Sequence, residues 1–388
     1  MKIDFKRPRH WLLLLLQGLY TAIVITLRPF YRRPEKPLVI LYGHQLSGNL
    51  RALYLEWRDR ERKEFDLYFL SLDPEYGAQL RRAGYRTLQC NRLADMLKLT
   101  RAAAVVSDHG LHMMTPLVRF TSLLFIDVWH GIPFKGFVPD DFKVQHSYDE
   151  IWVSSMQMKS MYEEKFGFQG SRVRSLGYAR TDRLFNCDSS EGGFRSAAGI
   201  AADARVVLYA PTWQQDDSGR QLFPFDQAGE AFVTALLDIC TDRGAVLVIR
   251  SHLNTDIDRH TDNGVLYCSQ KDFPDTEALL LSTDVLICDW SSIAFDFLAL
   301  DRPTIFLDVE PPFRNGFSLG REYRFGKVVG NMASLGDTLA ACLDNPEQYR
   351  VEQGALHRKI TDKLYDADLR GVAAGQQCAR LRYLLDTV

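Results

Sequence analysis

The sequence predicts an α/β protein made of two doubly wound domains. Short apolar runs alternate with longer stretches of helical spacing, which is typical of parallel strands joined by crossover helices. The runs form two sets, separated by a polar, glycine-containing stretch at residues 186–199 that indicates an interdomain connection. The length of 388 residues also suits two domains, since a domain typically has about 150 residues.

The apolar runs give the expected strands. These are residues 38–42, 65–72, 102–107, 123–129 and 150–155 in the first set, and 205–210, 245–250, 264–268, 284–289 and 303–308 in the second. We therefore divide the chain into a membrane-associated segment at 1–36 and two domains at 37–182 and 183–388. Doubly wound sheets bind ligands beyond the carboxyl ends of their strands, so we expect the functional residues there, at a cleft between the domains.

Composition narrows the class of protein. With 46% hydrophobic and 25% charged residues the chain is globular, and a net charge of −2 provides no basic field for nucleic acid. The seven cysteines include no C-x-x-C pair, so neither a disulfide framework nor a zinc site is expected. No Walker A, G-x-G-x-x-G or G-x-S-x-G motif is present.

The amino-terminal segment predicts contact with a membrane. Residues 1–36 carry eight basic and two acidic side chains, and Trp11–Leu27 between the basic clusters has no charge. This run is at the lower length limit for a span, and basic flanks on both sides give no orientation signal. We expect a monotopic anchor on anionic lipid, at the cytoplasmic face of the cell membrane. A single span and a signal peptide are the alternatives.

Phosphate-binding groups follow the strand at 284–289. Ser291 or Ser292 would cap the next helix, and a helix start with serine hydroxyls suits a phosphate, although an ordinary cap without ligand is equally compatible with the pattern. Asp296, one turn further on, would accept hydrogen bonds from a polyol hydroxyl of the same ligand.

Further candidates follow other strands. Arg250 and His252 share a face of extended chain and would converge on one anion, although a lone histidine there is more often structural. His130 has the intrinsic pKa of a general base, and Gly131 beside it permits close approach of a ligand. Other candidates are Thr212 as a hydroxyl donor, Trp213 as an aromatic wall and Arg180 as a cation.

Two patterns are discounted as metal sites. His109 and His112 form H-x-x-H without a third ligand, so we expect a polar loop there. Asp256 and Asp258 form D-x-D in a hydrophilic stretch, which we expect to be a solvated loop. No metal and no cofactor are predicted.

Several of these segments together resemble one family. In order along the chain they are GHQLSGNLRALYLEW, WHGIPFKG, LGYARTD, LYAPTW, IRSH and CDWSSIAFDFLALDRPTIFLD. They resemble the CDP-glycerol glycerophosphotransferase family of teichoic acid and capsule synthesis, over roughly residues 38–370. The resemblance implies a GT-B fold, that is, two Rossmann-like domains with the active site between them, and peripheral attachment to the membrane.

The resemblance also implies a reaction. Glycerol phosphate would pass from CDP-glycerol to a hydroxyl of a lipid-linked glycan or polyol-phosphate acceptor, with release of CMP. Domain 37–182 would bind the acceptor and domain 183–388 the donor. The resemblance assigns His130 as the base and His252 as a second catalytic residue. The residues that would bind substrate are Trp129, Gly131, Ile132, Pro133, Lys135, Arg180, Thr212, Trp213, Arg250, Ser251, Ser291, Ser292 and Asp296.

Other activities stay open at this point. A GT-B glycosyltransferase using a nucleotide sugar, a ribitol-phosphate transferase and a non-catalytic nucleotide sensor fit the same pattern. Trp290 stands where the family often has Tyr, and Gln214 where it often has Arg, so the identity of the donor is open. The modest length favours a primase-sized enzyme, and the sequence makes no prediction of oligomeric state.

Overall fold

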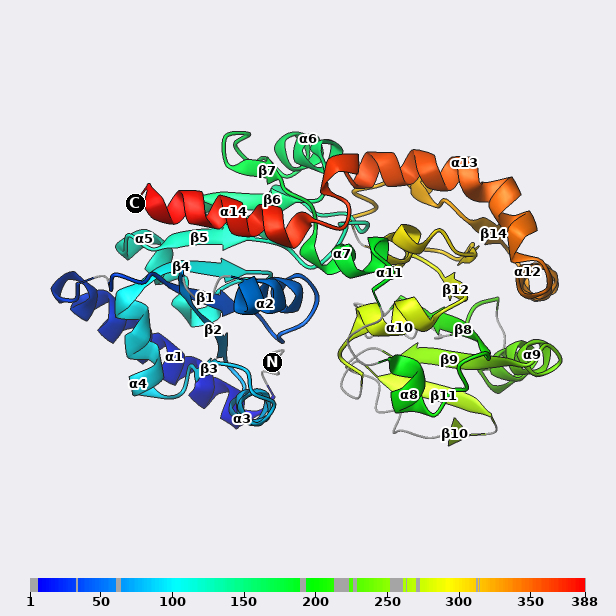
Figure 1. Ribbon diagram of the computed structural model, residues 1–388, viewed down its shortest axis with the longest axis horizontal. Coiled ribbons are helices and arrows are strands. Elements are labelled where there is room, and N and C mark those ends of the chain that lie inside the picture. Colours follow the sequence, from blue (N-terminus) through cyan, green and yellow to red (C-terminus); the bar gives the residue numbers. More distant parts are fainter. Residues whose placement is uncertain are drawn as a thin grey trace. The chain divides into compact units, whose positions relative to one another are not determined.

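The computed structural model describes residues 6–32, 34–60, 64–188, 193–212, 223–225, 229–251, 261–262, 264–269, 273–311, 313 and 315–387. The chain forms two compact units. Unit 1 comprises Met1–His130, Pro139–Asp182 and Asp366–Val388, and unit 2 comprises Gly131–Val138 and Arg183–Tyr365. Over the described residues, each unit carries one seven-stranded sheet with helices packed on it (Figure 1).

The sheet of unit 1 is parallel, with strand order β3-β2-β1-β4-β5-β6-β7. Its strands are β1 (Leu38–Tyr42), β2 (Asp66–Ser71), β3 (Thr87–Gln89), β4 (Ala102–Ser107), β5 (Leu124–Asp127), β6 (Glu150–Val153) and β7 (Val173–Ser175). The five strands predicted in this half are confirmed. The order changes direction between β1 and β4, which is the topological switch point of a doubly wound sheet.

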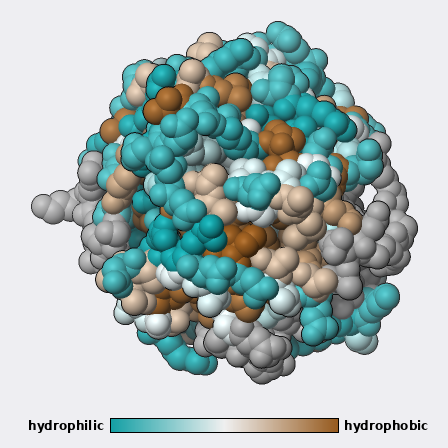
Figure 2. All heavy atoms as spheres, turned by 90° about the vertical axis from the view of Figure 1, so that its right-hand side faces the viewer, coloured by the Kyte–Doolittle hydropathy of each residue, from teal (hydrophilic) through white to brown (hydrophobic). Residues whose placement is uncertain are grey.

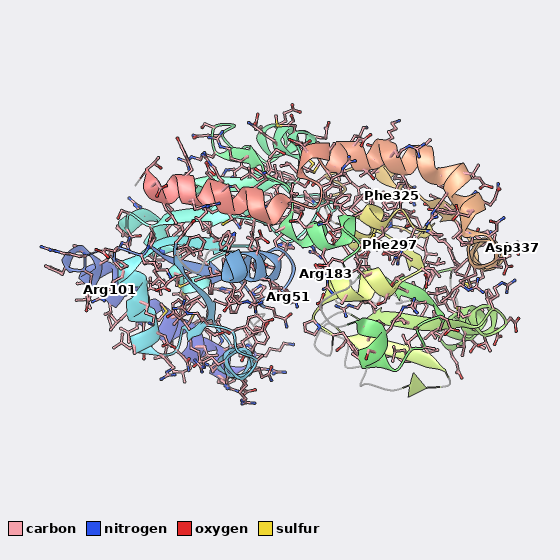
Figure 3. The ribbon with its side chains drawn as sticks, in the orientation of Figure 1. Arg51, Arg101, Arg183, Phe297, Phe325 and Asp337 are labelled. Carbon is pink, nitrogen blue, oxygen red and sulfur yellow. The ribbon has the colours of Figure 1, made fainter. Side chains whose placement is uncertain are left out.

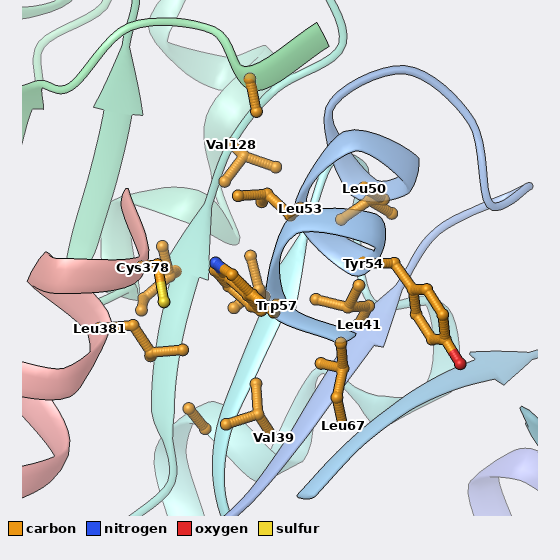
Figure 4. Packing of buried hydrophobic residues seen from close by; sticks show 14 of the residues in the cluster. Val39, Leu41, Leu50, Leu53, Tyr54, Trp57, Leu67, Val128, Cys378 and Leu381 are labelled. Carbon is orange, nitrogen blue, oxygen red and sulfur yellow. The ribbon is translucent and has the colours of Figure 1, made fainter. Parts of the chain in front are cut away.

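The helices of unit 1 include the carboxyl-terminal one. They are α1 (Pro8–Leu27), α2 (Gly48–Arg60), α3 (Pro74–Arg82), α4 (Leu93–Met96), α5 (Pro116–Phe120), α6 (Met156–Glu164) and α14 (Ala373–Asp386), and the chain leaves the unit within α7 (Ala179–Phe185). In the core, Trp57 of α2 lies beside Cys378 and Leu381 of α14 and above the strands (Figure 4).

Helix α14 is fixed to unit 1 by polar contacts at both its start and its middle. Asp182 accepts hydrogen bonds from the amides of Ala373 and Ala374, and Arg380 forms an ion pair with buried Glu150. Asp366–Val388, which the prediction assigns to the domain at 183–388, therefore belongs to unit 1. The division into acceptor and donor domains remains a prediction.

The sheet of unit 2 has the order β10-β11-β9-β8-β12-β13-β14 and is parallel except for the β10–β11 pair. Its strands are β8 (Arg205–Ala210), β9 (Ala245–Ser251), β10 (Thr261–Asp262), β11 (Val265–Ser269), β12 (Val285–Cys288), β13 (Thr304–Leu307) and β14 (Lys327–Val329). The five strands predicted in this half are also confirmed. The switch point lies between β8 and β12.

The helices of unit 2 are α8 (Phe194–Ala198), α9 (Gly229–Thr241), α10 (Thr276–Ser282), α11 (Ile293–Phe297), α12 (Met332–Asp344) and α13 (Pro346–Leu364). Phe297 and Phe325 are buried in its core, and Arg183 forms an ion pair with Asp275, the N-cap of α10 (Figure 3). Hydrophilic residues predominate on the face that Figure 2 shows, with hydrophobic ones in small patches.

The predicted membrane segment forms helix α1, which packs on unit 1 along one side. The buried side chain of Gln17 donates to the Tyr42 hydroxyl at 2.9 Å and accepts from the Met113 amide. The opposite side exposes Trp11, Leu12, Leu15 and Leu19. Within the described chain, Pro8–Phe30 is the helical segment whose length and composition would allow it to cross a membrane.

Candidate active site

Four histidines gather at the carboxyl edge of the unit 1 sheet. His44 follows β1, His109 and His112 follow β4, and His130 follows β5. The ring of His109 lies 4.4 Å from that of His44 and 4.3 Å from that of His130, and His44 lies 5.3 Å from His112. The cluster therefore occupies the switch point of this sheet, where doubly wound proteins bind ligands.

His130 is exposed and has a fixed orientation. Its Nδ1 lies 3.0 Å from the carbonyl oxygen of Asp108, which can only accept, so Nδ1 carries a proton and Nε2 is the acceptor nitrogen of the neutral ring. The imidazole lies between the rings of Trp129 and His109, each 4.3 Å away. The arrangement suits a neutral histidine that takes a proton through Nε2.

The turn that carries His130 is strained. Trp129 has φ = 48°, a left-handed conformation that bulky residues rarely adopt. Its amide donates to Asp127 Oδ1 at 2.8 Å, and its ring packs on Phe142. Strained backbone of this kind persists where the surrounding structure enforces it, and it is concentrated at functional sites.

Asn49 and Arg180 hold the same turn through hydrogen bonds to its main-chain carbonyls. Asn49 Nδ2 donates to the carbonyls of Val128 and Trp129, and its Oδ1 accepts from the amide of Arg180. The Arg180 guanidinium donates to the His130 carbonyl at 2.9 Å. The structure thus brings together the predicted residues Trp129, His130 and Arg180. Asn49 was missed, although it follows β1 within the GHQLSGN segment.

Burial and nearby charges set the protonation of this cluster. Burial lowers the pKa of His44 to about 2 and that of His112 to about 4, so both are neutral near pH 7. Burial also opposes charge on His109, but the Asp108 carboxylate, 2.7 Å from its Nδ1, outweighs this effect and raises the His109 pKa. Burial raises the pKa of Asp127 to about 8.

His109 and His112 lie in the loop after β4, as predicted, but the sequence did not predict that both rings pack into the histidine cluster. His109 stacks on His130, and His112 Nδ1 lies 2.8 Å from the buried hydroxyl of Tyr42. The strand order, which places the ends of β1, β4 and β5 side by side, explains the difference. Among the described residues, no three His, Cys, Asp or Glu side chains are placed to hold a metal ion. Asp256 and Asp258 lie outside the described residues.

The segment directly after His130 packs on unit 2. Gly131 has φ = 140°, which its missing side chain permits, and the chain then leaves unit 1. Phe134 contacts the rings of Trp290, Phe295 and Phe317. Main-chain contacts add to this, because the Gly316 carbonyl accepts from the Gly136 amide. The predicted residues Gly131, Ile132, Pro133 and Lys135 all belong to this segment, in which Ile132 is fully buried.

Thr212, one of the residues predicted to bind the donor, lies at the switch point of the unit 2 sheet. Thr212 follows β8, and both its amide and its hydroxyl donate to Asp289 Oδ1 at the end of the neighbouring strand β12. The Trp290 amide donates to the same oxygen at 2.6 Å. The Thr212 hydroxyl is therefore engaged within the protein, and Asp289, which was not predicted, organises this edge.

The serines after β12 are placed as predicted. Ser292 is the N-cap of α11 and is exposed, and its side chain makes no capping hydrogen bond. Ser291 precedes it and is half-buried. Asp296, predicted to face the same ligand, is instead 3% exposed within α11.

Arg250 lies on β9 with its guanidinium already bound to protein. It donates to the carbonyls of Ser269 and Phe273 and to the Thr276 hydroxyl. These contacts join β9 to the last residue of β11, to Phe273 and to the first residue of α10. The side chain of Ser251 and all of Trp213 and His252 lie outside the described residues.

Together these features define a protein of the GT-B fold class, with one mainly parallel α/β sheet in each unit. The fold matches that of a variant of the wall teichoic acid polymerase TagF, with a TM-score of 0.76 at 17% identity, over 96% of this chain and 94% of that chain.

The sequence model of CDP-glycerol:poly(glycerophosphate) glycerophosphotransferase matches residues 26–366, so the chain belongs to this family. It is 26% identical to the teichoic acid glycerol-phosphate transferase of Staphylococcus aureus, over 87% of this chain and 92% of that protein. It is also 26% identical to the teichoic acid poly(glycerol phosphate) polymerase of Bacillus subtilis, over 72% of this chain but only 40% of that longer protein. The predicted family, fold class and enzyme class are thereby confirmed.

Proposed function

We propose that the protein transfers glycerol phosphate from CDP-glycerol to a hydroxyl of a membrane-linked polymer acceptor in teichoic acid synthesis, and releases CMP. The family supports the reaction, since its description gives CDP-glycerol as donor and poly(glycerophosphate) as acceptor. The observation that carries the proposal is His130, held at the switch point of unit 1 with Nε2 as its acceptor nitrogen.

In the proposed reaction His130 is the general base. Nε2 takes the proton from the acceptor hydroxyl as its oxygen attacks the phosphorus that bears the glycerol. A new P–O bond forms, the bond between this phosphorus and the bridging oxygen breaks, and CMP leaves with the electron pair. The Asp108 carbonyl, hydrogen-bonded to Nδ1, stabilises the imidazolium that results.

Residues of unit 2 are proposed to bind the donor. Ser291 and Ser292 lie beyond the carboxyl end of β12, which pairs with β8, the strand that Thr212 follows, and their hydroxyls suit phosphate oxygens. For His252, Ser251 and Trp213, a role in binding the donor remains a proposal from the sequence. The guanidinium of Arg250 is hydrogen-bonded to the Phe273 carbonyl, which favours a supporting role in which Arg250 holds Phe273 near β9. We expect no metal to be needed, because phosphoryl transfer depends mostly on positioning and charge stabilisation.

We further propose that α1 lies in the plane of the cytoplasmic membrane surface. Trp11, Leu12, Leu15 and Leu19 form a helical stripe, with exposed fractions of 50%, 56%, 64% and 57%. Gln17 on the opposite side is bound to Tyr42 in the core of unit 1, which favours a helix that stays on the protein. Exposed Lys6, Arg7 and Arg32 near its ends would meet anionic lipid.

The test is product analysis with purified protein and lipid-linked acceptors. CDP-glycerol and CDP-ribitol are supplied in parallel, and CMP release and product mass are followed. CMP plus a glycerol phosphodiester supports the proposal, whereas preference for CDP-ribitol would reassign the donor. A glycosidic product from a nucleotide sugar, or binding of CDP-glycerol without turnover, would contradict it.

A further inference from the structure

His109 is placed between two other imidazoles and an acid. Its ring is stacked on that of His130 with an interplanar angle of 10°. The ring of His44 also contacts it, tilted by an interplanar angle of 51°. Its Nδ1 is 2.7 Å from Asp108 Oδ1. The carbonyl of Asp108 also accepts from His130 Nδ1. One residue, Asp108, therefore binds both rings of the stack, through its carboxylate and through its main chain.

The charges around the stack favour a proton on His109. His44 and His112 face it, and burial keeps both neutral near pH 7. Asp127 also faces it and, with a pKa of about 8, is largely protonated at that pH. Among the described residues, the charged groups beside the stack include the Asp108 carboxylate, which faces His109, and the Arg180 guanidinium, which is bound to the His130 carbonyl.

We propose that Asp108 and His109 form a carboxylate–imidazolium pair that positions His130 and keeps it unprotonated until it takes the proton of the acceptor hydroxyl. The inference rests on the proposed role of His130 as the base. The flat stack restricts rotation of the His130 ring, and the Asp108 carbonyl fixes its tautomer. The positive charge on His109 disfavours a second proton on the neighbouring ring, so His130 stays unprotonated down to a lower pH. During attack, the Asp108 carboxylate offsets the charge that develops on His130.

The first experiment compares the pH dependence of kcat/KM for CMP release in the wild type and in His109→Asn. Asparagine places an amide near the Nδ1 position, so it can still donate to Asp108, but it carries no charge. His112→Asn is the matched control. His112 is neutral over the assay range and its φ of 51° suits asparagine, which can replace its hydrogen bond to Tyr42.

We expect the acid limb of the His109→Asn profile to move up by about one pH unit, which is the effect of removing a unit charge about 4 Å away. At pH values below both midpoints its kcat/KM is lower by about tenfold through the same shift, while KM for CDP-glycerol is unchanged. In His112→Asn the acid limb stays at the wild-type pH, whatever the absolute rate. An acid limb that stays in place in a folded His109→Asn variant overturns the proposal, because a purely structural pair would lower stability without moving it.

A second measurement does not depend on activity. In protein labelled with ¹⁵N-histidine, the NMR signals report which rings are protonated at pH 7. We expect an imidazolium signal that is lost in His109→Asn and present in His112→Asn. A neutral His109 at pH 7 overturns the pair even if every variant is active. If instead His130→Ala keeps full activity, the proposed base is wrong, and this outcome is separate because the NMR signals still report on the pair.

Discussion

Replacing Asp127 by Asn tests whether the site contains a carboxyl group that stays protonated in the folded protein. Asp127 ends β5 and is 1% exposed. Its Oδ1 accepts from the Trp129 amide, and its Oδ2 has no hydrogen-bond partner among the described residues. Burial, opposed only in part by that hydrogen bond, raises its pKa from 3.8 to about 8.

The sign of the effect follows from proton binding. Between about pH 4 and pH 8 the folded protein holds a proton on Asp127 that the unfolded chain has lost, so its stability falls as pH rises. The slope is about 1.4 kcal/mol per pH unit, which amounts to about 5 kcal/mol at pH 8. Asparagine is neutral at every pH and removes this penalty. It leaves its N–H2 group unpaired where Oδ2 lies, at a cost of about 2 kcal/mol.

We therefore expect Asp127→Asn to be more stable than the wild type by about 3 kcal/mol at pH 8 and nearly equal to it at pH 5. The free energy of unfolding is measured by urea titration at both pH values, with tryptophan fluorescence as the signal. A variant that is less stable at pH 8, or a difference that is the same at both pH values, would refute a buried neutral acid at this position.

Four further outcomes are expected. His130→Ala should lower kcat by at least about 10³-fold with an unchanged circular dichroism spectrum, since the base is lost but the exposed ring supports little of the core; wild-type turnover would exclude it as the base. Activity should survive EDTA, and loss of turnover that magnesium restores would show that a metal is required. Leu15→Glu with Leu19→Glu should abolish flotation with anionic vesicles, whereas Val351→Glu, at an exposed apolar position on α13, should not. Equal flotation of both variants would contradict membrane binding through α1. Asn49→Ala should lower the free energy of unfolding by about 2 kcal/mol and also lower kcat, because it deletes the bonds that hold the Trp129 turn; a variant with wild-type stability and rate would contradict this role.

The strands that the sequence predicts are the interior ones, which have another strand on each side in the sheet. All ten apolar runs form strands, because a parallel strand covered on both faces has to be apolar along its whole length. The four strands that were missed, β3, β7, β10 and β14, are the edges of the two sheets. They are two or three residues long, as edge strands often are, and such segments carry no recognisable run.

The candidate site was predicted in part for the same reason. His130, Thr212 and Ser292 were found because each comes directly after a buried strand. His44 and His109 also follow predicted strands, but a histidine in a polar stretch gives no signal of its partner. Arg250 was correctly placed on its strand, yet its hydrogen bonds to Phe273 and Thr276 depend on where the next segment folds.

The amino-acid sequence by itself determined two α/β sheets, the apolar amino-terminal helix and the set of residues at the strand ends, because burial and hydrogen bonding constrain residue type locally along the chain. Only the tertiary structure decided which strand ends are neighbours. Strand order places His109 on His130. Packing between segments far apart in the sequence returns α14 to unit 1 and places residues 131–138 in unit 2. These are contacts between distant segments, and their free energy depends on complementary surfaces that no single segment specifies.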